Sequence, residues 1–579
     1  ENFICDLLNI PWQTIETIND PNLAWKAWEN NFNEVLDRHA PLRLQRIRHT
    51  AIPWLNSNIK KMMRNRDYHK KQSIKYGSEY HWRLYQASRN RVNIEIRKSK
   101  SRYYCQKIGE CNKNDPKTTW KLINSLIGRA SKTKHVNEIE IDDEIIRNDE
   151  NISEAFNEFF INIGPKLASE VSNQSTNKVE TYLENNKLII PSFRFMFIPV
   201  DNVLKTLRHL NVSKGAGLDK IPAKMLRIAA DIIAPSLTYI FNLSLSTGVF
   251  VENWKYAKVI PIYKEGNKRT LGNYRPISIL PIISKVFEKE IFTQLYKHLN
   301  ENCLISKFQS GFRPGHSTIT ALIQMCDNWY ENMDNGKLTG VVFLDIRKAF
   351  DSIDHVILLE KLAFYGVSQL ELAWFKSYLS NRQQQCQVNG CLSNKGEIIC
   401  GVPQGSILGP LLFLIYINDL PNCLKTTTPC LYADDTQIFA SSYDSVALAN
   451  DINSDLENVT DWLNVNKLQS HPSKAKLIVI GSKQNLTNKV DWHRPTIGET
   501  TKLKFKEEEM EINNTTSNYI KECSIAGYTH VVIVEFPSSE YVVNQVITSV
   551  AMFILMIPVI LLNGITVLTI WKSQHMRAK

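Results

Sequence analysis

Two adjacent aspartates, Asp434 and Asp435, constrain this chain more than any other feature of its sequence. They lie between Leu431-Tyr432-Ala433 and the strand-like run 436–440. Neighbouring side chains on a strand point to opposite faces, so two functional aspartates side by side suit a tight hairpin turn. An isolated Asp-Asp pair is also common in solvated turns, so the surrounding sequence has to decide between the two interpretations.

A third carboxylate lies upstream, where Asp345 follows Val341-Val342-Phe343-Leu344, an apolar run of strand length. Three aspartates on the ends of neighbouring strands can hold two Mg²⁺ ions, and two-metal sites catalyse in-line phosphoryl transfer. The three residues together predict a site of this class.

The charge of the chain is unevenly distributed. The net charge is +11, and eighteen basic residues but only three acidic ones lie between Arg43 and Lys107. Aromatic residues are interleaved there, among them Tyr68, Tyr76, Tyr80, Trp82, Tyr85, Tyr103 and Tyr104. Basic and aromatic side chains together suit the phosphates and bases of a nucleic acid. The alternative is a solvated basic helix pair with a tyrosine-rich inner face.

The eleven cysteines form no CxxC pair and no Cys/His cluster of zinc spacing, and they suggest no disulfide framework. No signal peptide is visible, and the chain opens at Glu1 rather than at methionine, so we expect an incomplete N-terminus. An apolar fraction of 43% supports packed cores over the 579 residues.

Five signatures between residues 273 and 435 occur in a fixed order: NYRPISIL, FQSGFRPGHST, FLDIRKAFDSIDH, GVPQGSILGP and YADD. With them, the block from about Lys258 to Gly481 resembles the reverse transcriptase of non-LTR (LINE-type, jockey-like) retrotransposons. Residues 40–255 resemble the stretch that these elements carry between endonuclease and polymerase. The FLDIRKAFD form favours this group over retroviral enzymes, YADD argues against viral RNA-copying polymerases, and group II intron maturases are the nearest relatives to exclude.

The resemblance implies an α+β right-hand polymerase of fingers and palm, with a truncated thumb, that acts as an RNA-directed DNA polymerase. Its partners would be an RNA template, a DNA primer or target and deoxynucleoside triphosphates, in the nucleus or cytoplasm. Its cofactor would be two Mg²⁺ ions, with Mn²⁺ as the alternative. Asp345 and Asp434 would bind both ions, Asp435 would support them, and Ile346 would offer its backbone carbonyl.

The resemblance also assigns the nucleotide site. Lys264 and Arg275 would contact the triphosphate, and Gln404 and Gly405 would line the nascent base pair. Phe350 would be the steric gate against a 2′-hydroxyl, the alternative being plain core packing. Two further expectations concern other residues: Lys474 would be a proton donor to pyrophosphate, although Ser473-Lys474-Ala475-Lys476 departs from the usual Lys-Thr, and Asp351 and Asp354 would cap helices or form turns. The residues proposed to bind nucleic acid are Arg64, Arg66, Lys70, Lys71, Tyr103 and Tyr104.

We therefore expect four parts. Residues 1–190 form a helical basic region, residues 191–483 form fingers and palm, residues 484–541 form a linker, and residues 542–571 form a transmembrane helix. No endonuclease sequence precedes the polymerase block, and the thumb helices expected after Lys483 are missing.

The tail differs in character from the rest. Residues 542–571 carry no charge over thirty positions, Lys572, Arg577 and Lys579 follow, and Asn513-Asn514-Thr515-Thr516 offers two overlapping glycosylation sequons. This pattern predicts a single-pass membrane anchor with a cytosolic C-terminus. The string Leu562-Asn563-Gly564 to Trp571-Lys572 resembles the first transmembrane helix of rhodopsin-like G-protein-coupled receptors. The alternatives to an active enzyme are a catalytically silent retroelement relic fused to such a receptor fragment, and a receptor fragment alone.

Overall fold

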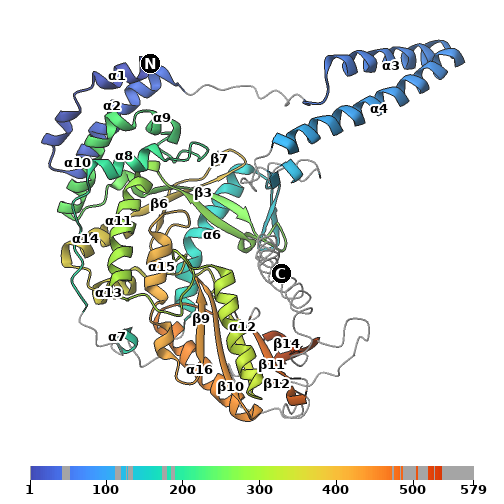
Figure 1. The fold of residues 1–579 in the computed structure, drawn as a ribbon. Helices are drawn as coiled ribbons and strands as arrows, with labels where there is room; N and C mark the ends of the chain where they lie inside the picture. Colours follow the sequence, from blue (N-terminus) through green and yellow to red (C-terminus); the bar gives the residue numbers. More distant parts are fainter. Residues whose placement is uncertain are drawn as a thin grey trace, which may run out of the picture. The chain divides into compact units, whose positions relative to one another are not determined.

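The computed structural model describes residues 2–41, 52–110, 119–120, 122–124, 127, 135–171, 179–183, 190–471, 475–482 and 484–486, and the backbone of the strands in 504–536. These residues form two compact units (Figure 1). The smaller unit spans Asp37–Val136, and the larger one comprises Glu1–Leu36 and Asn137–Lys579. The fold is α+β, as the sequence predicts.

The smaller unit is a hairpin of two long helices, α3 (Ser57–Tyr76) and α4 (Glu79–Glu110). Helix α3 begins after Asn56, whose side chain accepts a hydrogen bond from the backbone N–H of Ile59, and ends at Gly77, which adopts a left-handed φ of 57°. Ile59, Val92 and Tyr104 are buried in the hairpin. The exposed surface of the hairpin is largely basic.

The large sheet of the larger unit contains four strands that follow the predicted pattern. Their spatial order is β11 (Lys476–Ser482), β5 (Leu338–Leu344), β10 (Asp435–Ser442) and β9 (Thr428–Tyr432). Strands β9 and β10 form an antiparallel hairpin in which Tyr432 pairs with Asp435, so the predicted hairpin turn at the two aspartates is confirmed. In the second antiparallel pair Thr436 lies opposite Leu344, which brings the end of β5 beside this turn.

Three further strands extend this sheet beyond β11: β14 (Tyr528–Phe536), β13 (Ile520–Ala526) and β12 (Lys504–Phe505). The backbone of β14 runs parallel to β11, with Ile478 opposite Val532. The expectation that residues 484–541 are only a linker is therefore corrected, because the free edge of β11 is used for strand pairing.

Helices cover both faces of the large sheet. Strand residues alternate between the faces. Val341 packs with Met325 and Trp329 of α12 (Thr318–Asp334), whereas Val342 belongs to the main core together with Ile452 of α16 (Ser445–Val465). At Gly340 a Cβ atom would lie 2.5 Å from the Ile452 side chain, so a glycine lets α16 approach the sheet closely.

The small sheet has the order β4 (Tyr274–Ile279), β3 (Tyr256–Tyr263), β6 (Arg382–Val388) and β7 (Cys391–Leu392), with β8 (Gly396–Ile398) also paired to β6. Helix α6 (Asp149–Glu170) packs against β6, β7 and β8. Its Phe156 ring meets Tyr274 of β4 edge to face at 4.9 Å. Residues well before position 190 are therefore part of this sheet's own core.

The remaining elements surround the two sheets. They are α1 (Asn2–Leu8), η1 (Trp12–Thr17), α2 (Pro21–His39), β1 (Ile139–Ile141), β2 (Glu144–Ile146), α7 (Val179–Leu183), α8 (Val200–Arg208), α9 (Ala223–Ile228), α10 (Ala230–Thr247), η2 (Glu252–Lys255), η3 (Leu271–Asn273), α11 (Ile282–Glu301), α13 (His355–Phe364), α14 (Gln369–Leu379), α15 (Gly409–Ile417) and η4 (Leu420–Cys423).

The N-terminal helices belong to this core, which corrects the expected region 1–190. Trp25 stacks on Trp28 at 5.1 Å and meets Trp254 edge to face at 5.1 Å. The indole N–H of Trp28 donates to Ser236 Oγ at 3.0 Å. Residues 1–36 thus bury tryptophan-rich contacts against α10 and η2, and residues 37–136 alone form the separate unit.

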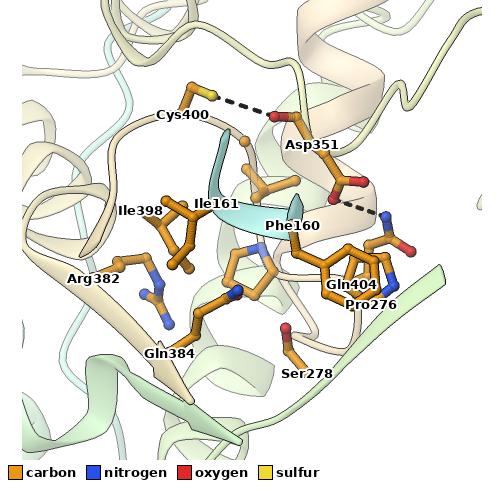
Figure 2. Close-up of a pocket in the computed structure, with 13 residues that line it drawn as sticks. Phe160, Ile161, Pro276, Ser278, Asp351, Arg382, Gln384, Ile398, Cys400 and Gln404 are labelled. Carbon is orange, nitrogen blue, oxygen red and sulfur yellow. Dashed lines mark hydrogen bonds between the residues drawn. The ribbon is translucent and has the colours of Figure 1, made fainter. Parts of the chain in front are cut away.

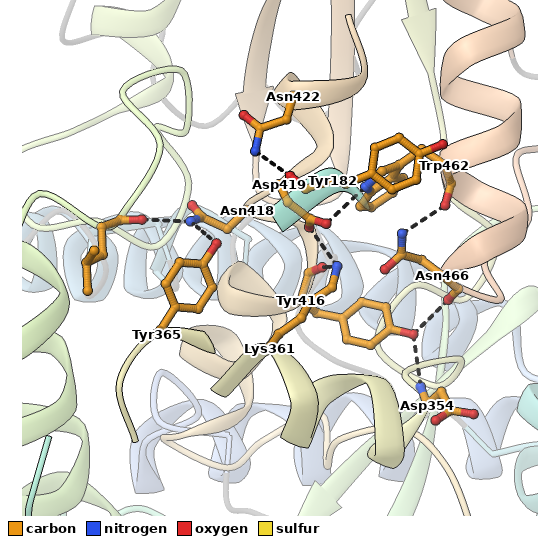
Figure 3. A network of polar contacts seen from close by, with 11 residues as sticks. Tyr182, Asp354, Lys361, Tyr365, Tyr416, Asn418, Asp419, Asn422, Trp462 and Asn466 are labelled. Atoms are coloured by element: carbon orange, nitrogen blue, oxygen red, sulfur yellow. Dashed lines mark hydrogen bonds and ion pairs between the residues drawn. The ribbon is translucent and has the colours of Figure 1, made fainter. Parts of the chain in front are cut away.

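A buried polar network ties α13, α15, η4 and α16 together behind the large sheet (Figure 3). The Lys361 ammonium donates to Asp419 Oδ1 at 2.6 Å and to the carbonyl of Tyr416. The Trp462 indole N–H donates to the second carboxylate oxygen of Asp419 at 3.3 Å. The Tyr416 hydroxyl donates to the Asn466 carbonyl at 2.7 Å. The network fixes the helices on which the large sheet rests.

Among the residues that the structure describes, no helix has the length and apolar character needed to cross a bilayer. The predicted transmembrane helix, residues 542–571, lies outside the described residues, as do the sequons at Asn513 and Asn514.

Candidate polymerase active site

The turn between β9 and β10 has an unusual backbone. Only Ala433 and Asp434 separate the paired residues Tyr432 and Asp435, and Ala433 adopts φ 58°. Two-residue hairpin loops require positive φ to match the twist of the strands. For a residue with a side chain, this left-handed conformation costs roughly 1 kcal/mol. The surrounding structure has to hold this turn.

Three carboxylates lie near enough to this turn for their charges to interact. Asp345 directly follows β5, which pairs with β10. Burial raises the pKa of Asp434, and the negative charge of Asp345 raises it further. Burial also raises the pKa of Asp435 to about 6, with added contributions from the charges of Asp434 and Asp345. The mutual repulsion means that the three groups lie within electrostatic reach of each other in a poorly solvated place.

Two cationic side chains of the small sheet face the same place. Arg275 lies on β4, and Lys264 follows β3, where its backbone N–H donates to the Asn273 carbonyl at 2.9 Å. Their positive charges lower the pKa values of Asp434 and Asp435, opposing the larger effect of burial. The structure therefore brings together Asp345, Asp434, Asp435, Arg275 and Lys264, with acids on one sheet and bases on the other.

The donor set fits a hard divalent cation, although the side chains are not gathered into a closed cage. Within the described part of the chain, no group of three or more His, Cys, Asp or Glu residues stands at metal-binding spacing. Mg²⁺ usually keeps several waters and takes one or two protein carboxylates together with substrate phosphates. A cation here would relieve the repulsion that raises the pKa values of Asp434 and Asp435.

Phe350 lies half-buried beside this site. Its ring stacks on Phe413 of α15 at 4.7 Å and meets Phe312 edge to face at 6.0 Å. Its carbonyl accepts a hydrogen bond from the backbone N–H of Val402 at 2.9 Å. The ring is therefore held firmly by the core on one side, and both interpretations of Phe350, gate and core residue, are compatible with this position.

The loop 401–410 contacts the small sheet through Gly405. This glycine has φ 136°, and a Cβ atom on it would lie 2.3 Å from the Ser278 carbonyl oxygen. Next to it, the Ser278 N–H donates to the Gln404 carbonyl at 2.8 Å. Only glycine fits this close approach. The close backbone approach at Gly405 is made to β4, and its role beside a nascent base pair stays a prediction.

Gln404 points into a small cavity behind this loop (Figure 2). Its amide donates to Asp351 Oδ1 at 2.9 Å, and the backbone carbonyl of Asp351 accepts from the Cys400 thiol at 3.3 Å. Burial raises the pKa of Asp351 to about 6. Asp351 therefore anchors the loop that carries Gln404. Asp354 caps α13 by accepting from the N–H groups of Val356 and Ile357, as expected for a capping residue.

For two of the predicted residues, Ile346 and Lys474, the structure says little about the proposed role. Ile346 is buried and forms an isolated antiparallel bridge with Ser470, beside a hydrogen bond of 2.7 Å from the His471 N–H to the Asp345 carbonyl. Lys474 lies outside the described residues. The roles assigned to both stay predictions.

In the smaller unit, the basic residues Arg64, Lys70 and Lys71 are candidates for phosphate contacts; Arg64 and Lys71 are exposed, and Arg66 pairs with Asp67 at 2.7 Å. Tyr104 is only 6% exposed and its ring contacts Trp54 at 5.4 Å, so little of that ring is available to a base. Tyr103 is half-buried against the same tryptophan. Within helices α3 and α4, the exposed aromatic rings include Tyr68, Tyr76, Tyr80 and Trp82, around the turn of the hairpin.

Sequence reasoning missed one residue that contacts the active-site turn. Gln309, in the FQSGFRPGHST signature, is buried and accepts a hydrogen bond from the Ala433 N–H at 2.9 Å. A polar residue in a segment without helical or strand periodicity gives little local signal. The order of the signatures is the only hint that this segment belongs near YADD.

Comparison with known proteins agrees with this geometry. Residues 262–519 match the family described as reverse transcriptase (RNA-dependent DNA polymerase). This stretch contains Arg275, Asp345, Asp434 and Asp435, the charged residues described above.

Three of the similar curated proteins come from mobile elements. The chain is 32% identical over 293 residues to the RNA-directed DNA polymerase from mobile element jockey of Drosophila melanogaster, covering 49% of this chain and 32% of that protein. It is 29% identical over 321 residues to the probable RNA-directed DNA polymerase from transposon BS of the same species, covering 53% and 34%. The corresponding protein from transposon X-element is 33% identical over 229 residues, covering 39% and 25%. The chain spans about a third of the length of these relatives.

Proposed function

We propose that this chain is an RNA-directed DNA polymerase of a non-LTR retrotransposon. The observation that carries the proposal is the meeting of Asp345, Asp434 and Asp435 on the palm with Arg275 and Lys264 on the fingers. Carboxylates on the large sheet can hold cations, and basic side chains of the small sheet can contact a triphosphate whose charge those cations neutralise. The match over residues 262–519 and the mobile-element relatives support the same reaction.

The residues that line the proposed nucleotide site have roles that follow from their chemistry. Arg275 supplies a planar fork for phosphate oxygens, and Lys264 supplies a mobile point charge. The ring of Phe350, fixed by Phe413, would lie beneath the sugar and exclude a 2′-hydroxyl. Gln404 and Gly405 would line the nascent base pair, with the loop held by Asp351 and β4.

The three carboxylates would hold two Mg²⁺ ions, with Mn²⁺ as the alternative. The backbone carbonyl of Ile346 would be a further ligand. Such ions, when bound, favour ionisation of an attacking hydroxyl and neutralise the leaving pyrophosphate. Burial raises the pKa values of Asp434 and Asp435 and neighbouring carboxylates raise them further, so a cation bound there would offset negative charge held in a poorly solvated place.

The test is primer extension on an RNA template by the purified chain with Asp434→Asn. The substitution removes one ligand charge, so extension should stop while affinity for the RNA–DNA duplex stays nearly unchanged. Asp444→Asn is the matched control, because Asp444 caps α16 by accepting from the Ala447 N–H and asparagine caps equally well.

Three outcomes decide the matter. Retained extension in Asp434→Asn would remove Asp434 from the site. Wild-type protein that binds the duplex but never extends it, in Mg²⁺ or Mn²⁺, would favour the catalytically silent relic. Loss of extension in both substitutions would show a folding defect instead of a catalytic one.

We also propose that the α3–α4 hairpin grips template RNA. Arg64, Lys70 and Lys71 on α3 would contact phosphates, with Arg66 after release from Asp67. Because Tyr104 is buried against Trp54, base stacking would fall mainly to the exposed rings near the turn, with Tyr103 contributing its accessible edge.

The fused membrane tail is a separate proposal. Residues 542–571 would anchor the chain in a membrane, in the manner of the first helix of a G-protein-coupled receptor, while the polymerase part would work in the nucleus or cytoplasm. A single span with a cytosolic C-terminus would put the polymerase on the opposite side from its nucleotides. A transcript read that crosses residues 480–540 would establish whether the two parts share one messenger.

A further inference from the structure

The segment Phe308–Gly311 lies along the outer edge of β9. The Ser310 N–H donates to the Leu431 carbonyl at 2.8 Å, and the Leu431 N–H donates to the Phe308 carbonyl at 3.0 Å. These two bonds, with the parallel bridge between Gln309 and Leu431, make the segment a short extra strand beside the active-site hairpin. The backbone of the segment is thereby fixed relative to the turn.

From this strand, the Gln309 side chain reaches the turn and brackets Ala433, which means that its amide hydrogen-bonds both the backbone N–H and the backbone carbonyl of that residue. Its Oε1 accepts from the Ala433 N–H at 2.9 Å, and its Nε2 lies 3.4 Å from the Ala433 carbonyl, to which it donates. The same Oε1 accepts from the Gly311 N–H at 2.7 Å. Gln309 is 2% exposed, so water cannot replace these bonds cheaply.

The turn and the segment are in close contact at Gly311 as well. A Cβ atom on Gly311 would lie 2.1 Å from the Ala433 nitrogen and 2.8 Å from its Cα. No side chain fits there, so glycine is required by the approach of two backbones. Ala433, meanwhile, holds a left-handed conformation that a residue with a Cβ adopts at a cost.

We propose that Gln309 is a positioning residue that holds Ala433 in its left-handed conformation and thereby sets the direction of Asp434. The role rests on the proposed function for its catalytic consequence, but the bracket itself is a property of the fold. A primary amide is the side chain that suits the task, because it presents an acceptor to an N–H and a donor to a C=O at once.

Charge gives a second reason for an amide at position 309. A carboxylate of similar size could accept from the two N–H groups but would repel the Ala433 carbonyl. It would also add a negative charge next to the turn that carries the carboxylates of Asp434 and Asp435. Glutamine satisfies the turn without this charge.

The test compares Gln309→Met, which keeps the volume and removes both hydrogen-bonding groups, with Gln294→Met. Gln294 of α11 is a matched control, because its amide brackets the backbone of Met196 in the same way. It accepts a hydrogen bond from the Met196 N–H at 2.8 Å and donates one to the Met196 carbonyl at 3.0 Å. The first readout is hydrogen exchange of residues 431–435, which does not depend on catalysis. Exchange there should rise at least about tenfold in Gln309→Met and not in Gln294→Met.

The second readout is primer extension. Gln309→Met should lower kcat by about 10- to 100-fold, the scale of a displacement near 1 Å of a catalytic group, with little change in KM for the nucleotide or in duplex affinity. Ala433→Gly should reduce the loss, because glycine adopts the left-handed conformation without the bracket. This coupling is expected only if Gln309 acts through Ala433.

Unchanged exchange at 431–435 in Gln309→Met would overturn the proposal. So would a loss of kcat that is the same with and without the Ala433→Gly substitution, or one that Gln294→Met shares. If the exchange rises as expected but the wild-type protein extends no primer, the bracket stands and the proposed polymerase activity fails.

Discussion

The buried ion pair between Lys361 and Asp419 allows a stability prediction with a worked magnitude. The two side chains are 0% and 1% exposed and 2.6 Å apart. The Lys361 ammonium also lies over the rings of Tyr416 and Trp462, 5.0 and 5.1 Å from their centres. Lys361→Met keeps much of the volume but removes the cation, so that the Asp419 carboxylate keeps the Trp462 N–H at 3.3 Å and loses its ion-pair partner.

Removing one partner of a buried pair costs roughly 3–5 kcal/mol, because an uncompensated charge stays in the interior, whereas replacing both partners by apolar groups is often neutral or stabilising. Lys361→Met should therefore lower the urea midpoint of the larger unit clearly, and adding Asp419→Leu should restore much of it. Circular dichroism during urea titration measures both.

The matched control is Lys467→Met, which breaks an ion pair of the same length, 2.6 Å to Asp354, whose lysine is 49% exposed. Exposed pairs contribute about 0–1 kcal/mol. If Lys361→Met and Lys467→Met lower the midpoint equally, or if the double substitution is as unstable as Lys361→Met alone, burial does not govern the contribution and the reasoning is refuted.

Three other predictions concern the active site and the hairpin. Phe350→Ala should raise ribonucleotide incorporation relative to deoxynucleotides in primer extension, and an unchanged ratio in a folded protein would mean that Phe350 is only a core residue. Asp351→Asn should keep the bond from Gln404 and remove a group whose pKa is raised to about 6. The neutral acid stabilises the wild type below about pH 4 and this contribution is lost as pH rises through 6. The variant should therefore gain up to about 3 kcal/mol relative to wild type between pH 4 and 7, and a pH-independent difference would contradict the cause. Exchanging Arg64, Arg66, Lys70 and Lys71 for glutamine should flatten the salt dependence of RNA binding by roughly 0.7 per lost contact, while Trp82→Ala should weaken binding at all salts by about 1–3 kcal/mol; a basic set without effect would make the hairpin a scaffold.

The sequence predicts the elements that carry a local pattern. Strand β5 follows from its apolar run and the β9–β10 hairpin from the paired aspartates at its turn, and the structure has both. The meeting of Asp345 with Asp434 could be expected because each follows or interrupts an apolar strand. The run Val531-Val532-Ile533-Val534 is strand-like as well, and the interpretation of residues 484–541 as a linker overlooked it.

Contacts between distant segments could not be predicted in this way. The stacking of Trp25 on Trp28 is readable as helical spacing, but the docking of both near Trp254 joins residues more than two hundred positions apart. Tyr104 looks available for a base in the sequence, because burial is not visible in a basic, aromatic-rich stretch. Gln309 looks like a loop residue, since its partner Ala433 lies in another signature.

The proposed active site lowers the stability of the fold, and contacts made by other residues have to offset this loss. Buried carboxylates that raise each other's pKa values make the ionised palm less stable at neutral pH, and Ala433 adds the cost of a left-handed residue. A divalent cation bound between these carboxylates would relieve the repulsion. The opposing contributions come from residues that touch no substrate: the bracket of Gln309 around Ala433, and the buried pair of Lys361 and Asp419 that fixes the helices behind the sheet. Loss of the Gln309 bracket should therefore change the direction of Asp434. Loss of the Lys361–Asp419 pair should instead lower the stability of the sheet that carries Asp434.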